Sequence, residues 1–292
     1  MTRRTLLHVL WRIVTFLIVV LLTITTLFFV IPYLGHRVSL IWLVLAIYIL
    51  IAYVFIPLVV RFWRIVMKPD HLPRYVLASD GWPSDPINIV IVTHSKRQLI
   101  NSMKTAGWTV AGKSTIASTL KLLLAIVFQR SYPEAPFSKL YLFGRHQDIG
   151  FQMQTGDPPS PRHRHHVRFW QLHEEHITKH SSHHEHATFW RRLLHTISGT
   201  NTVWIGAATH DVGPLAIRRR NGQITHQISQ YTEDERDFII ETLQNAGLIR
   251  SKHVVNAGAP LKINGQTFGV SIIVDGNVVV IRLRRKLLRP RT

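Results

Sequence analysis

Two long apolar runs open the chain, and shorter alternating patterns of apolar and polar residues follow them. Ile13 to Leu34 and Val38 to Val60 contain no charged side chain, and they are 22 and 23 residues long. At about 1.5 Å of rise per helical residue, each run can cross the ~30 Å hydrocarbon core of a bilayer. The first run is too long for a signal peptide, and a second follows at once. The pattern therefore predicts a two-helix transmembrane anchor within residues 1–67.

The orientation of this anchor follows from its basic flanks. The two runs are separated only by Gly35, His36 and Arg37, so the helices form an antiparallel hairpin and both chain ends lie on one side. Positive residues stay cytoplasmic. We therefore expect a two-pass plasma-membrane protein whose soluble domain and both termini are cytoplasmic. The basic residues outside the hairpin loop are Arg3, Arg4, Arg12, Arg61, Arg64, Lys68 and Arg74.

The soluble part begins after residues 68–86, whose Pro, Asp and Gly content indicates a linker. Residues 87–93 are β-branched and apolar, which predicts a buried strand. Ser95 with Gln98 has the spacing of a capping box for a helix that ends at Gly107. Thr232 with Glu235 predicts a second capping box, for a helix that ends near residue 246.

Between and after these helices the chain alternates apolar and polar residues over short stretches. A third helix is expected near 113–128. Asp275-Gly276-Asn277 is typical of a hairpin turn between the last two strands. Short connections favour an antiparallel or mixed sheet, so we predict an α+β domain with about three helices over 87–285, followed by a basic tail, 286–292. The expected strands are 139–144, 148–153, 163–171, 202–209, 213–219, 224–228, 269–274 and 277–284.

Charge and cysteine content narrow the function classes. The chain has 35 Lys and Arg against 16 Asp and Glu, a formal net charge of +19, and no cysteine. Disulfides, Cys-ligated zinc and a Cys nucleophile are excluded. A basic soluble part beside a membrane most simply meets anionic lipid headgroups. Nucleic acid is not expected as a partner, because the chain has no helix-turn-helix, zinc-finger or RNP-type signature.

The densest concentration of chemically active side chains is SPRHRHHVRFW, residues 160–170. If this segment is a strand, Arg162, Arg164, His166 and Arg168 share one face, and His165 lies on the other. Guanidinium groups bind phosphate and carboxylate bidentately, so the arginines are candidate anion ligands. The alternative is a solvated basic strand.

Three further segments add candidate site residues. YLFGRHQDIGFQ places Arg145 in or near a turn, VWIGAATHDVG ends an apolar strand with Asp211, and ITHQI centres His226 in an apolar strand. A histidine in such a strand is also a common satisfied core residue. The candidate catalytic residues are His165, His166, Asp211 and His226, and the candidate anion-binding residues are Arg145, Arg162, Arg164 and Arg168. We expect Arg164, His166, Arg168, Asp211 and His226 to converge in a concave pocket.

Together these segments resemble the C-terminal domain of the LssY family over about Trp82 to Leu248. The matching pieces are Y-L-F-G-R-x-Q-D, S-P-R-x-R-H-H-V-R, W-x-G-A-A-T-x-D, and T-H-x-I followed by Asp234-Glu235-Arg236-Asp237. The resemblance fixes no activity. Related domains occur beside membrane modules of the DedA and lipid-phosphatase types, which suggests a lipid or polyprenyl phosphate by association.

The chain departs from that pattern at about 171–201, which has the composition of a histidine-rich insertion. On a helix, residues at i, i+3 and i+4 line one face and can bind a divalent metal such as Zn²⁺, Ni²⁺ or Cu²⁺. A Ser-, His- and Glu-rich tract is also typical of a flexible surface loop. The candidate ligands are His173, His176, His180 and His183.

A P-loop pattern, G-x-x-x-x-G-K-[ST], is present at residues 107–114 and would make Gly112, Lys113 and Ser114 nucleotide ligands. A P-loop requires a strand that runs directly into its first glycine. Here a helix is expected in that place, so the context contradicts the motif.

These observations leave three functions open. The domain binds an anionic, phosphate-bearing group, which could belong to a lipid, or it is a phosphohydrolase acting on a lipid or polyprenyl phosphate, or it is a P-loop nucleotide-binding protein. Catalysis stays undecided because no motif fixes a reaction. The sequence does not identify a cofactor, and a divalent metal is a candidate.

Overall fold

The computed structural model describes most of the chain. The described residues are 17, 21, 24–26, 28, 33, 40–60, 75–79, 81, 83–173, 190, 193–195, 199, 201–217, 222–267 and 270–285. The chain divides into two compact units. The first contains Met1–Pro69, Ser79–Trp82 and Arg219–Gln223, and the second contains the rest.

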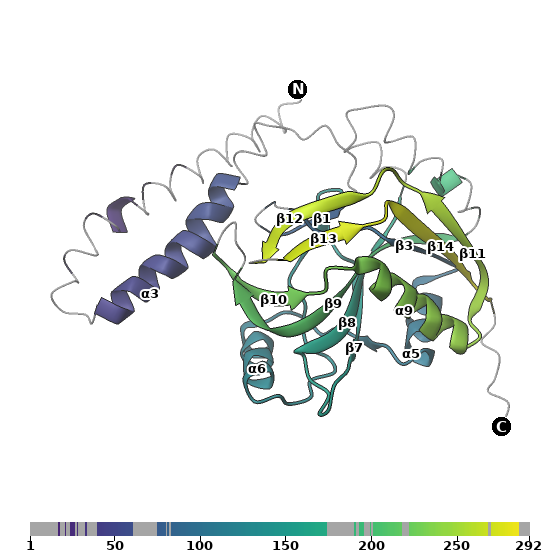
Figure 1. The fold of residues 1–292 in the computed structure, drawn as a ribbon, viewed down its shortest axis with the longest axis horizontal. Helices are drawn as coiled ribbons and strands as arrows, with labels where there is room; N and C mark the ends of the chain where they lie inside the picture. Colours follow the sequence, from purple (N-terminus) through teal and green to yellow (C-terminus); the bar gives the residue numbers. More distant parts are fainter. Residues whose placement is uncertain are drawn as a thin grey trace. The chain divides into compact units, whose positions relative to one another are not determined.

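One helix in the described part of the chain is long and apolar enough to cross a membrane. It begins as α3 (Leu40–Leu50), continues through a π-helical turn, η2 (Ile51–Phe55), and reaches residue 60 (Figure 1). Over Ile41–Val60 its mean hydropathy is 2.9 and almost none of it is buried in the protein. The predicted second span is thus an apolar helix. Most of the first predicted span lies outside the described residues, so the structure does not show a two-helix hairpin.

The second unit is built on one large mixed sheet, as predicted for an α+β domain. Among the described strands of this sheet, β3 and β14 run parallel and the other neighbouring pairs are antiparallel. Strand β10 (Ile224–Ile228) also pairs with β9 but is not part of the main strand order. That order is β11 (Ile249–Asn256), β14 (Asn277–Leu283), β3 (Ile89–Thr93), β9 (Thr202–Ile217), β8 (His163–Gln171), β7 (Ile149–Gln154) and β4 (Thr109–Val110).

Two smaller sheets accompany the large one. The first joins β2, β1, β5 and β6, and the second is the pair β12 and β13. Their bounds are β1 (Tyr75–Leu77), β2 (Pro83–Pro86), β5 (Tyr141–Leu142), β6 (Arg145–His146), β12 (Leu261–Thr267) and β13 (Val270–Val274).

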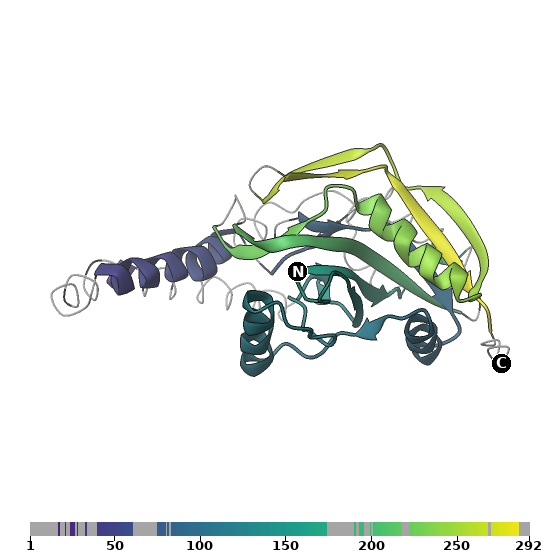
Figure 2. The same ribbon diagram turned by 60° about the horizontal axis from the view of Figure 1, so that its bottom comes forward.

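Apolar side chains cover both faces of the large sheet. Every residue of β3 is buried, as expected for a central strand with both faces covered. Helices α5 (Lys96–Thr105) and α9 (Thr232–Asn245) pack one face through Leu99, Met103, Ile239 and Leu243. In Figures 1 and 2, α9 lies along the sheet beside β14. Trp170, Val90 and Ile205 belong to the core on the opposite face.

The first predicted helix start agrees with its capping signal in part, and the second does not. The Ser95 hydroxyl accepts from the Gln98 amide at 3.2 Å, so the first capping box is present in part. Gly107 follows that helix at φ +90°, where a residue without Cβ is favoured. The prediction of a second capping box at Thr232 and Glu235 is wrong, because the N-cap of α9 is Tyr231 and no side chain bonds to the helix end there. Glu235 instead points into the fold toward His165.

Three strand predictions need correction. Residues 202–217 form one continuous strand, where two had been expected. Strands β13 and β14 are not hydrogen-bonded to each other in the described sheets, so Asp275-Gly276-Asn277 is a corner and not a hairpin turn. The segment read as a linker contains β1 and β2, because its Pro and Asp residues lie at strand positions. The basic tail, 286–292, lies outside the described residues.

Candidate functional site

Strands β8 and β9 form an antiparallel ladder that carries the predicted site residues on two faces. Arg164 lies opposite Asp211, and His165 lies opposite His210. Successive strand residues point to opposite faces, so His166 shares a face with Arg164, and His165 does not. The predicted alternation is therefore correct. We call the face with Arg164, His166 and Arg168 the arginine face, and the face with His165 the histidine face.

The arginine face holds a closed network of charged and polar side chains. Arg164 donates to Asp211 at 2.7 Å and to the Gln152 side chain at 3.0 Å. Arg168 donates to Asp85 of β2 at 2.8 Å. Each guanidinium is thus paired with a carboxylate inside the fold.

This network is shielded from solvent. The side chains of Arg164 and Arg168 are 4% and 6% exposed. The Phe137 ring lies 5.1 Å from the Arg164 guanidinium carbon and 4.7 Å from that of Arg168. It also packs against Gly150, where a Cβ would come within 2.5 Å of the ring. Burial lowers the pKa of Arg168.

The predicted convergence is thus largely present, but it is not an open site. Arg164, Arg168 and Asp211 lie together with His166, whose Nε2 is 2.9 Å from the Thr209 hydroxyl. His226 lies on β10 opposite Leu215, and only its backbone is described. A buried, mutually neutralised network aligns strands and offers no free cation to an outside anion. Its clearest role is to fasten β2 and β9 to β8.

The other two predicted anion ligands are also occupied. Arg145 bonds to Asp148 at the turn before β7. Arg162 donates to the carbonyl oxygens of Ile126 at 2.7 Å and Val127 at 3.2 Å. It therefore satisfies the exposed carbonyls at the end of helix α6 (Ile116–Val127). None of the four predicted arginines is available for an anion without breaking a contact within the fold.

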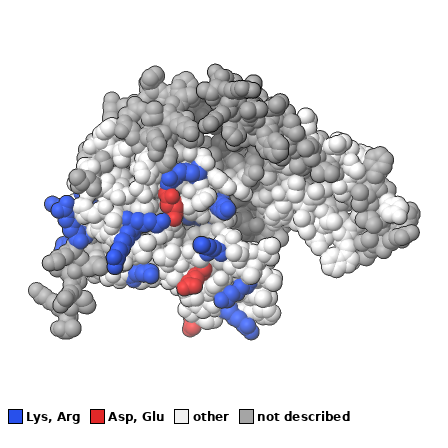
Figure 3. Space-filling model, turned by 180° about the vertical axis from the view of Figure 1, so that it is seen from behind, with Lys and Arg blue, Asp and Glu red and all other residues white. Residues whose placement is uncertain are grey.

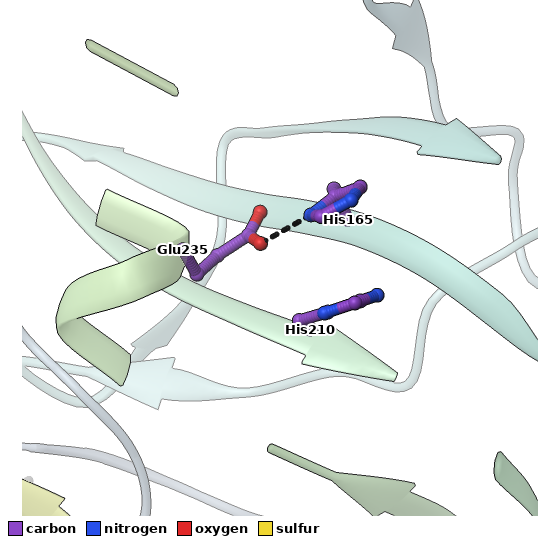
Figure 4. A group of neighbouring side chains, drawn as sticks. All are labelled: His165, His210 and Glu235. Carbon is purple, nitrogen blue, oxygen red and sulfur yellow. Dashed lines mark hydrogen bonds and ion pairs between the residues drawn. The ribbon is translucent and has the colours of Figure 1, made fainter. Parts of the chain in front are cut away.

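The histidine face carries a different group, His165, His210 and Glu235 (Figure 4). His165 Nδ1 lies 2.5 Å from Glu235 Oε2, and the two imidazole rings stack with centroids 4.0 Å apart. Burial raises the pKa of Glu235 to about 10 and lowers that of His165 to about 4. Burial also lowers the pKa of His210. Burial thus disfavours charge on each of these three side chains when no ion lies between them.

The predicted metal ligands of the histidine-rich insertion cannot be placed. His173 is an exposed residue after β8, whereas His176, His180 and His183 lie outside the described residues.

The P-loop look-alike has the wrong geometry. Helix α5 precedes Gly107, and the amide of Trp108 bonds to the Met103 carbonyl as part of that helix end. Lys113 is exposed in a loop, and α6 begins at Ile116 behind a capping box of Thr115 and Ser118. No strand enters the first glycine, so the backbone cradle of a phosphate loop is not formed.

An open pocket lies at the carboxyl ends of the parallel strands β3 and β14. Arg285 donates to His94 Nε2 in its wall. Arg250 and Arg282 have no carboxylate partner among the described residues, and the lining contains none. In open sheets, ligands bind outside the carboxyl ends of parallel strands. The lining residues are Val92, Thr93, His94, Asn201, Arg250, Arg282, Leu283 and Arg285.

The sequence did not predict this basic pocket, nor two of the three residues of the histidine-face group, His210 and Glu235. His94 follows a predicted strand and Arg282 belongs to another, but nothing in the pattern indicated that the two strands run side by side. Glu235 was assigned to a helix cap on its spacing from Thr232. His210 stands beside Asp211 in the sequence. That it lies opposite His165 could be known only from the register of β8 against β9.

Comparison with known proteins supports one assignment. No curated protein and no solved structure matches the chain. The family model described as LssY C-terminus matches residues 69–278, which includes the β8–β9 ladder, both faces of it and Arg250. This match covers more than half of the chain, so the chain belongs to the LssY C-terminal family.

Proposed function

We propose that this protein is a membrane-anchored module whose cytoplasmic domain binds an anionic, phosphate-bearing group in the basic pocket at the ends of β3 and β14. The observation that carries the proposal is the cluster of His94, Arg250 and Arg282 in an open pocket with no acid in its lining. Guanidinium groups that are not neutralised by the protein are suited to phosphate oxygens.

The surface charge agrees with such a ligand. The charged side chains on the face shown in Figure 3 are mostly Lys and Arg. A basic field raises the local concentration of anions and attracts the anionic cytoplasmic leaflet of a membrane. The same chemistry would accept a free phosphate or the headgroup of an anionic lipid.

A titration of the full chain in neutral detergent tests the proposal. Inorganic phosphate, a short-chain phosphatidic acid and a short-chain phosphatidylcholine are the three probes. We expect the first two to raise the melting temperature, because a ligand that binds only the folded state stabilises it. A stronger effect of phosphatidic acid than of phosphate would identify a lipid headgroup as the ligand. No effect of either acidic probe would refute the proposal.

The membrane topology is the second part of the proposal. Helix 41–60 supplies one span, and we infer a second span from residues 13–34. Both termini then lie on the cytoplasmic side of the plasma membrane. The chain has no cysteine, so single introduced cysteines report accessibility cleanly. In intact cells Gly35→Cys should react with an impermeant maleimide, and Thr292→Cys should react only after permeabilisation. Labelling of Thr292→Cys in intact cells would contradict this topology.

Helix α6 offers an apolar face that fits the membrane surface. Ile116, Leu120, Leu123 and Val127 are 92%, 58%, 42% and 58% exposed. Their spacing places them on one side of the helix, and exposed Lys121 flanks that side. An apolar stripe with basic flanks is typical of helices that lie in the lipid interface. Because the same chain is anchored in a membrane, we propose that this stripe contacts lipid.

A polarity-sensitive dye at Leu120→Cys measures this contact in nanodiscs. We expect a blue-shifted emission that lipids with nitroxide-labelled chains quench, because the stripe enters the acyl boundary. Asn101→Cys on the exposed side of α5 is the matched control and should show neither effect. An unquenched dye at residue 120, with energy transfer between two copies of the chain, would show that the stripe is a dimer contact instead.

The phosphohydrolase alternative has weaker support. It requires His166, Arg164 and Asp211 to reach a substrate, whereas these side chains bond within the fold under Phe137. A nucleotide site at Gly112, Lys113 and Ser114 has the least support, since α5 replaces the required strand.

A further inference from the structure

We propose that His165, His210 and Glu235 form a binding site for one divalent transition-metal ion, with Zn²⁺ the best match. Each residue offers a ligand atom, and these three atoms lie within 4.8 Å of one another. Two imidazole nitrogens and one carboxylate oxygen are a ligand set used for zinc, with a fourth position left for water. The inference is independent of the proposed anion pocket, which lies among other residues.

The backbone holds the three ligands from two rigid directions. His165 and His210 are directly opposite each other in the β8–β9 ladder, so their separation is set by the sheet. Glu235 comes from the first turns of α9, which packs on the same face. Ligands placed on strands and a helix are better fixed than ligands on loops.

Burial without full hydrogen bonding is the second observation that points to a ligand. The Glu235 side chain has no exposed surface. Its Oε1 atom and the Nε2 atom of His210 have no hydrogen-bond partner among the described residues. A buried polar atom left unpaired costs about 1–3 kcal/mol, so such atoms usually have a function or a bound partner. A cation between the carboxylate and the two rings would satisfy both atoms.

Metal binding requires one change in the geometry. The imidazole planes are nearly parallel, at 16°, whereas a metal ion lies close to the plane of each ring that binds it. Phe238 stacks on His165 with centroids 3.9 Å apart and fixes that ring. His210, whose Nε2 makes no hydrogen bond within the described residues, is therefore the ring that turns toward the ion.

The histidine-rich insertion would obscure a simple metal titration, because its own histidines bind metal loosely. The test therefore uses the full chain in detergent, with all seven histidines of the insertion changed to serine and with bound metal removed by a chelator. They are His173, His176, His180, His183, His184, His186 and His195. Zn²⁺ is the probe, bound metal is counted by mass spectrometry, and the melting temperature is recorded. We expect one Zn²⁺ per chain and a rise in melting temperature with Zn²⁺ concentration.

Variants of the proposed ligands, made in the chain without the insertion histidines, distinguish a metal site from a hydrogen-bonded pair. Glu235→Gln and His210→Gln should weaken Zn²⁺ binding by at least about 100-fold, more than the loss of an outer hydrogen bond to a ligand. Glu241→Gln, on the exposed side of α9, is the matched control and should bind like the parent chain. The melting temperature of each metal-free variant shows that it is folded.

Two results would overturn the proposal. The parent chain without the insertion histidines could bind no Zn²⁺, which would leave His165 and Glu235 as a hydrogen-bonded pair. Alternatively, folded Glu235→Gln and His210→Gln could bind Zn²⁺ as tightly as Glu241→Gln, which would place the ion elsewhere. Substitution with Co²⁺ adds a spectroscopic check, since four-coordinate tetrahedral Co²⁺ at this site absorbs strongly in the visible range and the two ligand variants should lose that absorption.

Discussion

Asp211→Ala is expected to lower the free energy of unfolding of the soluble domain by about 3–5 kcal/mol, because it leaves Arg164 charged, buried and without its carboxylate. The pair is 2.7 Å apart, and the two side chains are 4% and 3% exposed. Trp170 and Trp204 are buried in the same domain, so their fluorescence reports unfolding by denaturant in detergent. A loss of this size is a large part of the stability of an ordinary domain.

The matched control is Asp237→Ala, which removes an ion pair with Arg236 at the surface. The Asp237 side chain is 60% exposed, so the expected loss is about 0–1 kcal/mol. A double variant, Arg164→Met with Asp211→Leu, should recover part of the stability, since apolar replacement of both partners removes the buried charge. Similar small losses for Asp211→Ala and Asp237→Ala would show that the arginine face is open to water and available to an external anion.

Changing Arg250 and Arg282 together to glutamine is expected to weaken phosphate or phosphatidic acid binding by about 100-fold or more. A hydrogen bond to a charged group contributes about 1.5–3 kcal/mol, so the loss of two guanidinium contacts should remove at least about 3 kcal/mol of binding free energy. Binding would be measured by isothermal titration calorimetry on the full chain in neutral detergent. Raising the salt concentration should weaken binding to the original chain more than to the variant.

Arg97→Gln, compared with Arg250→Gln alone, is the charge-matched control for this pocket, because each removes one positive charge. Arg97 is exposed on α5 and is not part of the pocket lining. It should leave the affinity nearly unchanged if binding depends on the position of the cations. An equal loss for Arg97→Gln would indicate that only the net charge of the domain attracts the anion.

The fold was predictable from sequence where local chemistry decides it. Strand 163–171 and its alternation of faces followed from period-two patterning, and Gly107 fixed the end of α5 because it adopts φ +90°. Strand pairing was not predictable. Residues 202–217 were read as two strands with a break at 210–212, because the polar His210 and Asp211 end the apolar run. In the structure this is a single strand, and β10 pairs with its later half.

The candidate sites show the same limit. Arg164 and Arg168 were grouped from strand alternation, and Asp211 was expected beside them from the family resemblance. The partner that neutralises Arg168 is Asp85, in a segment that looked like a linker. Free and occupied arginines have the same sequence signature. Which cations remain open to a ligand is decided by contacts between distant segments.

The central claim is that the oxyanion site is the open pocket and not the buried arginine face. Tungstate, a phosphate-like anion with a strong anomalous signal, can be soaked into crystals of the full chain to locate the site. The account predicts a peak within hydrogen-bonding distance of Arg250 and Arg282. A peak beside Arg164 and Arg168 with Phe137 displaced, or no peak in the domain, would contradict it.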